Sequence, residues 1–216
     1  VGVADDKGGC AAAMLAAALL LSLGVARAEV PAAPCAVAAP VAGDLQAYAA
    51  TFFAKASPAD LDALAACLGD PDPAVRDGFA FTLWSEGLRG RHLTDAQMRR
   101  ALAQLTRMVT APEDAAGFRR PFAVLTLSEV ARADRIAAYL TDAELHALAE
   151  TGAVYLRGVT DYRGFTPGEG WRHGVAHGAD LALQLVLNPR LTRGDADRLL
   201  GAIAAQVAPV ASPYYH

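Results

Sequence analysis

Four segments of the chain carry the same helix-start signal, and this repetition restricts the fold more than any other feature. Each begins with a hydroxyl residue, at Ser57, Thr94, Thr141 or Thr192, and has Asp, Gln or Glu three residues later. The hydroxyl can cap exposed helix amides, and the later side chain can bond back to the cap. Ala and Leu are abundant and only 7% of residues are aromatic, which favours packed helices over strands. The sequence therefore predicts an all-α fold.

A second helix is expected after each of the first three signals, and its start repeats as well. Arg76, Arg119 and Arg172 are each followed two residues later by Gly or Pro and four residues later by Ala, at intervals of 43 and 53 residues. Helix pairs that repeat about every 40 to 47 residues are typical of HEAT and armadillo proteins. We predict a HEAT/armadillo-like stack of antiparallel helical hairpins over residues 44–210, with a coincidental four-helix bundle as the alternative. The longer interval places an inserted loop at residues 160–170.

The N-terminal region has the features of an exported protein. Residues 10–26 are uncharged and mostly Ala and Leu, and small residues follow where a signal peptidase would cleave. We predict a signal peptide over residues 1–28, a Pro/Ala-rich leader over residues 29–43 and a C-terminal tail over residues 211–216. A retained membrane anchor or an apolar core helix is the alternative to the signal. The mature bacterial protein would then be periplasmic or extracellular, without a membrane span.

The cysteines support one further expectation. Cys10 would leave with the signal, so the mature chain would keep Cys35 and Cys67. In an oxidising compartment these two can form a disulfide between the leader and the first helix. The alternative is a free Cys67 buried on an apolar helix face.

Charge and motifs exclude several functions. The net charge is -4, only 19% of residues are charged, and no long run of Lys or Arg occurs, so nucleic acid is not expected as a partner. The sequence has no glycine-rich nucleotide loop, nucleophile elbow, CxxC pair or EF-hand loop. His92 and His146 show no partner pattern and are expected to be solvated. A protein or small-molecule partner stays unidentified, and we expect a monomer.

Polar residues in the third hairpin are the first candidates for chemistry. His173, His177 and Asp180 are spaced to share one helix face. Their counterparts in the earlier hairpins are core residues: Phe81 and Val124 for His177, Trp84 and Leu127 for Asp180. The two imidazoles can chelate a transition metal ion with Asp180 as a third ligand, and Glu129 or Glu169 would supply a catalytic base. The alternative is a buried hydrogen-bonded network.

The inserted loop is the second candidate site. Functional residues often lie on loops carried by a rigid scaffold, and side chains able to hold a ligand gather in or near residues 160–170. They are Asp161, Tyr162, Arg163, Trp171, Arg172, Arg119 and Arg120. A structural ladder is the preferred account of the three repeated arginines, in which each guanidinium bonds acids and carbonyls of adjacent turns, such as Asp72, Asp114 and Glu169.

Three stretches, DPDPAVRDG, GFRRPFAVLTLSEVARADR and DYRGFTPGEGWRHGVAHGADLALQLVLNP, resemble a bacterial family of unknown function, DUF2785. The similarity covers about residues 60–209. The resemblance implies an all-helical, HEAT-like fold, and it implies no substrate, reaction or catalytic residue.

Two functions follow as hypotheses. The first is an exported helical-repeat protein that acts as a binding or scaffold module, because stacked hairpins present extended surfaces. The alternative is a metal-dependent hydrolase or related enzyme that uses His173, His177 and Asp180. The fold alone does not decide between them.

Overall fold

Hydroxyl caps start four of the helices, as the sequence predicts. In this computed structural model, which describes residues 35–39, 44–112 and 115–209, Ser57, Thr94 and Thr141 each form a complete capping box. Thr192 accepts a hydrogen bond from the Asp195 amide. Each cap satisfies amide groups that a helix start would otherwise leave without partners. The predicted signal peptide, most of the leader and the C-terminal tail lie outside the described residues.

The described residues form eight α-helices, two short helices and one two-stranded sheet. The α-helices are α1 (Leu45–Lys55), α2 (Pro58–Ala66), α3 (Thr82–Arg89), α4 (Asp95–Thr110), α5 (Arg119–Ile136), α6 (Asp142–Gly158), α7 (Gly174–Val186) and α8 (Arg193–Val207). The short helices are η1 (Cys67–Gly69) and η2 (Ala74–Phe81), and the strands are β1 (Phe165–Thr166) and β2 (Gly170–Trp171). The all-α prediction is confirmed.

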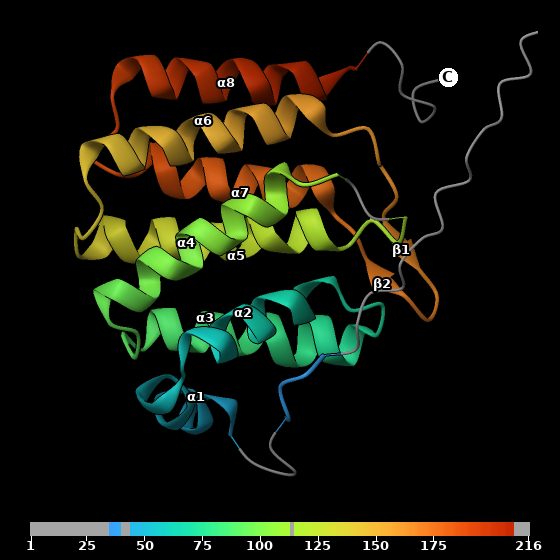
Figure 1. Ribbon diagram of the computed structural model, residues 1–216. Helices are drawn as coiled ribbons and strands as arrows, with labels where there is room; N and C mark the ends of the chain where they lie inside the picture. Colours follow the sequence, from blue (N-terminus) through green and yellow to red (C-terminus); the bar gives the residue numbers. More distant parts are fainter. Residues whose placement is uncertain (1–34, 40–43, 113–114, 210–216) are drawn as a thin grey trace, which may run out of the picture. The chain divides into compact units, whose positions relative to one another are not determined.

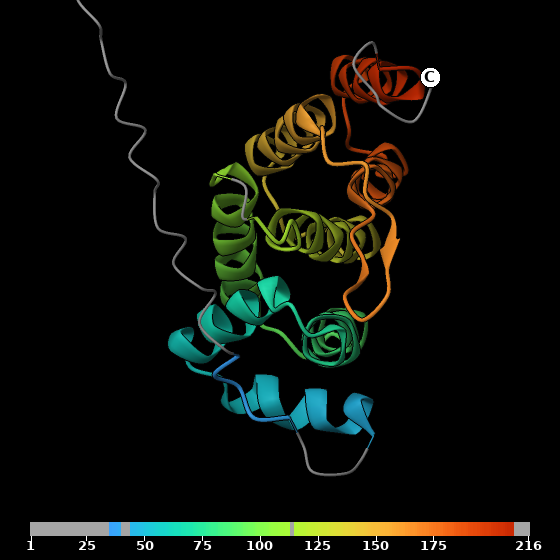
Figure 2. The ribbon, with the colours of Figure 1, turned by 90° about the vertical axis from the view of Figure 1, so that its right-hand side faces the viewer.

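The helices pack in two rows (Figures 1 and 2). Helices α2, α4, α6 and α8 are successive neighbours in one row, and α3, α5 and α7 are successive neighbours in the other. The turns between α4 and α5 and between α6 and α7 join the rows, and α1 packs on α3. Leucines such as Leu64, Leu105, Leu127 and Leu148 fill the core between the rows. Within the part of the chain described here, no helix is long and apolar enough to cross a membrane.

A disulfide joins Cys35 to Cys67, with the two Cα atoms 4.7 Å apart. The bond ties the segment that precedes α1 to the short helix η1, 32 residues further along the chain. Of the two alternatives left by the sequence, the disulfide is the one found.

The predicted insertion forms a β-hairpin between α6 and α7. Its strands pair Phe165 with Trp171 and Thr166 with Gly170. The hairpin lies beside the start of α5 and near η2, because Glu169 and Arg172 bond to residues of both regions. Residues far apart in the sequence therefore meet at this end of α5.

Candidate functional site

Two arginines enclose an aromatic ring at the start of α5. The guanidinium carbons of Arg76 and Arg172 lie 3.7 Å and 4.3 Å from the ring centroid of Phe118. Arg76 is 0% exposed and Arg172 is 3% exposed. Cation–π contacts with desolvated guanidinium groups are the stronger kind. This arrangement fixes the hairpin to the helices on which the candidate residues stand.

The donors of both arginines are bonded. Arg76 donates to the backbone carbonyls of Asp70, Pro71 and Glu169. Arg172 donates to the Ala116 carbonyl at 2.8 Å, to the Thr166 hydroxyl and to the Glu169 carboxylate. These bonds are the structural ladder predicted for the two arginines. Glu169 contributes both its carbonyl and its carboxylate to this ladder.

Two further arginines of the predicted ligand set, Arg119 and Arg120, also bond the backbone. Arg119 donates to the Pro112 carbonyl and Arg120 donates to the Val109 carbonyl at 2.9 Å. The Arg120 guanidinium also lies over the Tyr155 ring, 5.8 Å from its centroid. Both residues therefore help to connect the start of α5 to neighbouring segments.

The histidines form an aromatic row with the hairpin. The His173 ring stacks on Trp171 at 4.2 Å between centroids and 7° between planes, and it lies 5.8 Å from the His177 ring. His177 in turn meets the Phe122 ring edge to face. His173 is half-buried and His177 is buried, so the row runs from the exposed Trp171 into the core.

The sequence placed His177 and Asp180 at core positions, and this is wrong for Asp180, which is exposed. The cause is the facing of α7. Its buried residues are Gly174, His177, Gly178, Leu181, Ala182 and Leu185, so His177 lies at one edge of the buried face. Three residues later in a helix of 3.6 residues per turn, Asp180 lies beyond that edge, on the solvent side.

The buried histidine is held uncharged. Burial is the main cause that lowers the pKa of His177 to about 4, and the nearby charge of His173 lowers it further. Its Nδ1 atom has no hydrogen-bond partner among the described residues. Among those residues, no three His, Cys, Asp or Glu side chains lie together as metal ligands would. The metal interpretation of His173, His177 and Asp180 stays a prediction.

Glu129 is a residue of α5, the middle helix of the row formed by α3, α5 and α7. Its carboxylate is buried and accepts two hydrogen bonds from Arg89 of α3. The Asp180 side chain on α7 is exposed, but partial desolvation by neighbouring atoms is the main cause that raises its pKa, and the charge of Glu129 is the second. The Glu129 carboxylate is therefore engaged by Arg89 of α3, and its charge also acts on Asp180 of α7. A catalytic-base role for Glu129 stays a prediction.

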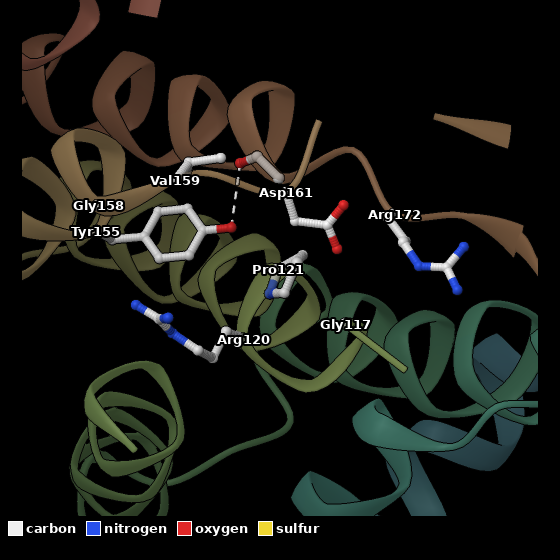
Figure 3. A pocket seen from close by; sticks show the side chains of 9 residues that line it. Gly117, Arg120, Pro121, Tyr155, Gly158, Val159, Asp161 and Arg172 are labelled. Carbon is white, nitrogen blue, oxygen red and sulfur yellow. Dashed lines mark hydrogen bonds between the residues drawn. The ribbon is translucent and has the colours of Figure 1, made fainter. Parts of the chain in front are cut away.

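A cavity between α5, α6 and α7 is very small, because the side chains around it pack closely (Figure 3). Arg120, Tyr155, Asp161 and Arg172 surround it, and the Tyr155 hydroxyl donates to the Gly174 carbonyl at 3.1 Å. Its volume is about 10 Å³, which is room for about one water molecule. This cavity joins elements and leaves no space for an organic ligand.

A larger pocket opens between the inserted loop, the start of α7 and the end of α8. We call it the hairpin pocket; it has a volume of about 460 Å³ and is lined by Asp161, Tyr162, Arg163, Gly164, His173, Gly174, Val175, Ala176, Ala179 and Gln206. Arg163 bonds the Asp161 carboxylate and, as the largest cause, lowers the pKa of Asp161. The Tyr162 hydroxyl donates to Gln206 Oε1 at 2.9 Å. Three of the predicted ligand residues therefore line one pocket, together with His173.

Gly117 allows the loop to approach α5 this closely. Its φ is +74°, and a Cβ atom there would lie 2.6 Å from Asp161 Oδ2 and 2.7 Å from the Arg163 guanidinium. Any side chain at this position would push away the Asp161–Arg163 pair.

A family model for a protein of unknown function, DUF2785, matches residues 91–216. The chain belongs to the DUF2785 family. The resemblance drawn from the sequence is thus confirmed over those residues, and the DUF2785 match contains the whole hairpin pocket but not Arg76. No curated protein and no solved structure matches the chain.

Sequence reasoning missed a hydrogen-bonded cluster within the DUF2785 match. His146 of α6 is not simply solvated, because its Nδ1 lies 2.7 Å from the buried carboxylate of Asp195 in α8. Arg198 and the Thr192 hydroxyl bond the same carboxylate. The sequence held no signal for this contact, because Thr192 and Asp195 have the spacing of a capping box and His146 is 49 positions from Asp195.

Proposed function

We propose that the protein is an exported, monomeric binding module with HEAT-like repeats, and that the hairpin pocket holds its ligand. The observation that carries this proposal is the pocket itself, which the inserted loop forms against α7 and α8. Its volume of about 460 Å³ falls within the range of small-molecule sites. The loop is also the one long departure from the repeated spacing of the hairpins.

The lining indicates the kind of ligand. Val175, Ala176 and Ala179 provide an apolar wall along α7, while Asp161 and Arg163 provide a carboxylate and a guanidinium at one end. These two charges cancel because they pair with each other at 2.8 Å. Such a site suits a small molecule with an apolar body and a polar end that is uncharged or zwitterionic.

The backbone of His173 supports a functional role for this pocket. Its φ of 53° is left-handed, which is uncommon outside glycine. Unfavourable backbone conformations persist where the surrounding structure enforces them, and they gather at ligand sites. Stacking on Trp171 holds the His173 ring at the pocket.

Export and a repeat stack are supported by separate features. Disulfides persist in oxidising compartments, and Cys35–Cys67 is one. The two rows of helices follow the repeated caps, as expected for a HEAT-like stack. Export predicts that the protein recovered from a bacterial periplasm begins at Glu29, as determined by N-terminal sequencing. A chain that retains residues 1–28 would contradict the signal-peptide proposal.

The pocket is tested by blocking it. L-leucine and L-phenylalanine are probes with an apolar body and a zwitterionic end, and we expect at least one to raise the melting temperature of the protein. Ala179→Trp should remove that shift, because Ala179 is exposed and lines the pocket. Ala147→Trp, at an exposed site of α6 outside the pocket, is the matched control. Equal binding by Ala179→Trp and the wild type, or no binding of either probe, would overturn this proposal.

A further inference from the structure

A second pocket lies at the opposite end of α5. We call it the arginine pocket; its volume is about 370 Å³, and its lining includes Arg89, Arg91, Arg132, Leu88, Leu93 and Met98. The end of α3, the start of α4 and the end of α5 contribute to it. Its volume falls within the range of small-molecule sites, and it shares no residue with the hairpin pocket.

The guanidinium groups of this pocket differ in their partners. Arg89 is bonded to the Glu129 carboxylate. Arg91 and Arg132 make no side-chain hydrogen bond or ion pair with the described residues, although Arg132 is half-buried. Asp95 is the single acidic residue in the lining, against three arginines. The pocket therefore has an excess of positive charge and two guanidinium groups with donors available for a ligand.

The backbone of Arg91 is a second, independent feature. Arg91 has a φ of 59° and follows the end of α3, where the His92 amide bonds the Gly87 carbonyl and the Arg91 amide bonds the Leu88 carbonyl. This is the Schellman arrangement, in which the left-handed position is usually glycine. An arginine in that position costs stability, and its side chain lines the pocket. Arg91 and His173 are the two non-glycine residues with positive φ in the described chain, and each lines a pocket.

The walls below the arginines are apolar. Leu88 and Leu93 are buried, and Met98 is half-buried. Ile136, which is 55% exposed, lies at the same pocket from the end of α5. An alkyl chain bound here would cover part of that exposed surface and remove apolar area from water.

We infer that the arginine pocket binds an amphiphilic anion, a carboxylate that carries a short alkyl chain. The carboxylate would bond Arg91 and Arg132, since guanidinium groups match carboxylate geometry and form charge-assisted bonds. The alkyl chain would lie along Leu88, Leu93 and Met98. This site goes beyond the proposed function and does not depend on the hairpin pocket.

Isothermal titration calorimetry with decanoate tests the inference, using the full chain below the micelle concentration of decanoate. We expect wild-type protein to bind decanoate, and to bind decylamine at least tenfold more weakly because its charge is reversed. Arg91→Gly should weaken decanoate binding about tenfold or more. Its melting temperature should be unchanged or higher, because glycine suits the left-handed backbone. Arg132→Gln should weaken binding to a similar degree.

Two control variants test whether decanoate binds at the arginine pocket and not elsewhere on the protein. Arg193→Gln removes an arginine whose side chain is 89% exposed, outside the pocket, and it should bind decanoate as the wild type does. Ala179→Trp blocks the hairpin pocket and should also leave decanoate binding unchanged, so the two proposals fail separately. Absence of decanoate binding, or unchanged binding in the Arg91→Gly, Arg132→Gln double variant, would overturn the inference. Equal binding of decanoate and decylamine would also overturn it.

Discussion

The two ends of helix α5 use arginine in opposite ways. At the hairpin end, Arg76 and Arg172 are buried, lie against Phe118 and donate to carbonyls and a carboxylate. At the other end, Arg91 and Arg132 have no side-chain hydrogen bond or ion pair with the described residues. The comparison shows that the residue type alone does not indicate its role. Satisfied donors connect elements of the fold, whereas donors without partners are available to a ligand.

The two ends of α5 should differ in how much stability the protein loses when an arginine side chain is removed. Removing a buried, fully bonded guanidinium leaves acceptors without partners in the core, which is costly. Removing a guanidinium that bonds nothing leaves the folded state almost unchanged. Substitutions at the two ends of α5 test this difference.

Arg76→Met is expected to lower the free energy of unfolding by about 3–5 kcal/mol, because the carbonyls of Asp70, Pro71 and Glu169 lose their donor. The same substitution at Arg132 should lower it by less than about 1 kcal/mol. Urea unfolding followed by circular dichroism measures both values. Similar losses at the two positions would remove the distinction between the ends.

His177 should make the hairpin end sensitive to acid. Its pKa is lowered to about 4 from an ordinary value of about 6.5, so the unfolded chain takes up a proton more readily. Stability is then complete above pH 6.5, falls as the pH drops to about 4, and loses about 3 kcal/mol in total. His177→Leu should flatten this part of the stability curve. An unchanged slope between pH 6.5 and 4 in the variant would contradict the assignment.

Arg91→Gly is expected to raise the free energy of unfolding by about 0.5–1 kcal/mol, because glycine adopts the left-handed backbone without strain. His173→Gly removes the same kind of strain at the hairpin end but also removes the ring stacked on Trp171, which is worth a similar amount. Its stability should therefore change little. Denaturant midpoints compare the two variants, and a loss of stability in Arg91→Gly would argue against backbone strain there.

Glu129→Gln should lower the pKa of Asp180, because the Glu129 charge contributes to the raised value. The carboxyl carbon resonance of Asp180 reports this pKa in an NMR titration. Arg132→Gln leaves the Glu129 charge in place and serves as the control. A pKa that stays the same in Glu129→Gln would show that burial alone raises it.

Much of the fold follows from local sequence. The four caps and the repeated second helices predicted the helix starts at Ser57, Thr94, Thr141 and Thr192. Capping depends on residues three positions apart, so the sequence contains all the groups involved. The repeat spacing, a second feature visible in the sequence, predicted the insertion at residues 160–170 and identified Arg76 and Arg172 as equivalent positions.

The candidate sites could be predicted only in part. The sequence placed Asp161, Tyr162 and Arg163 near a ligand, and they line the hairpin pocket. It placed Asp180 in the core, and this was wrong because His177 lies at the edge of the buried face of α7 and Asp180 lies beyond that edge. It gave no indication of Arg91 or Arg132 as ligand residues, because Arg91 belongs to no motif and the family resemblance that covers Arg132 implies no binding residue.

Local sequence was enough to predict where four helices begin and which two cysteines could join. Those features depend on neighbouring residues and on a period that repeats along one chain. The tertiary structure decided which side chains share a pocket, which guanidinium groups have partners and which way α7 faces. These outcomes depend on contacts between residues about 40 to 90 positions apart, as between Arg89 and Glu129 or Arg76 and Glu169.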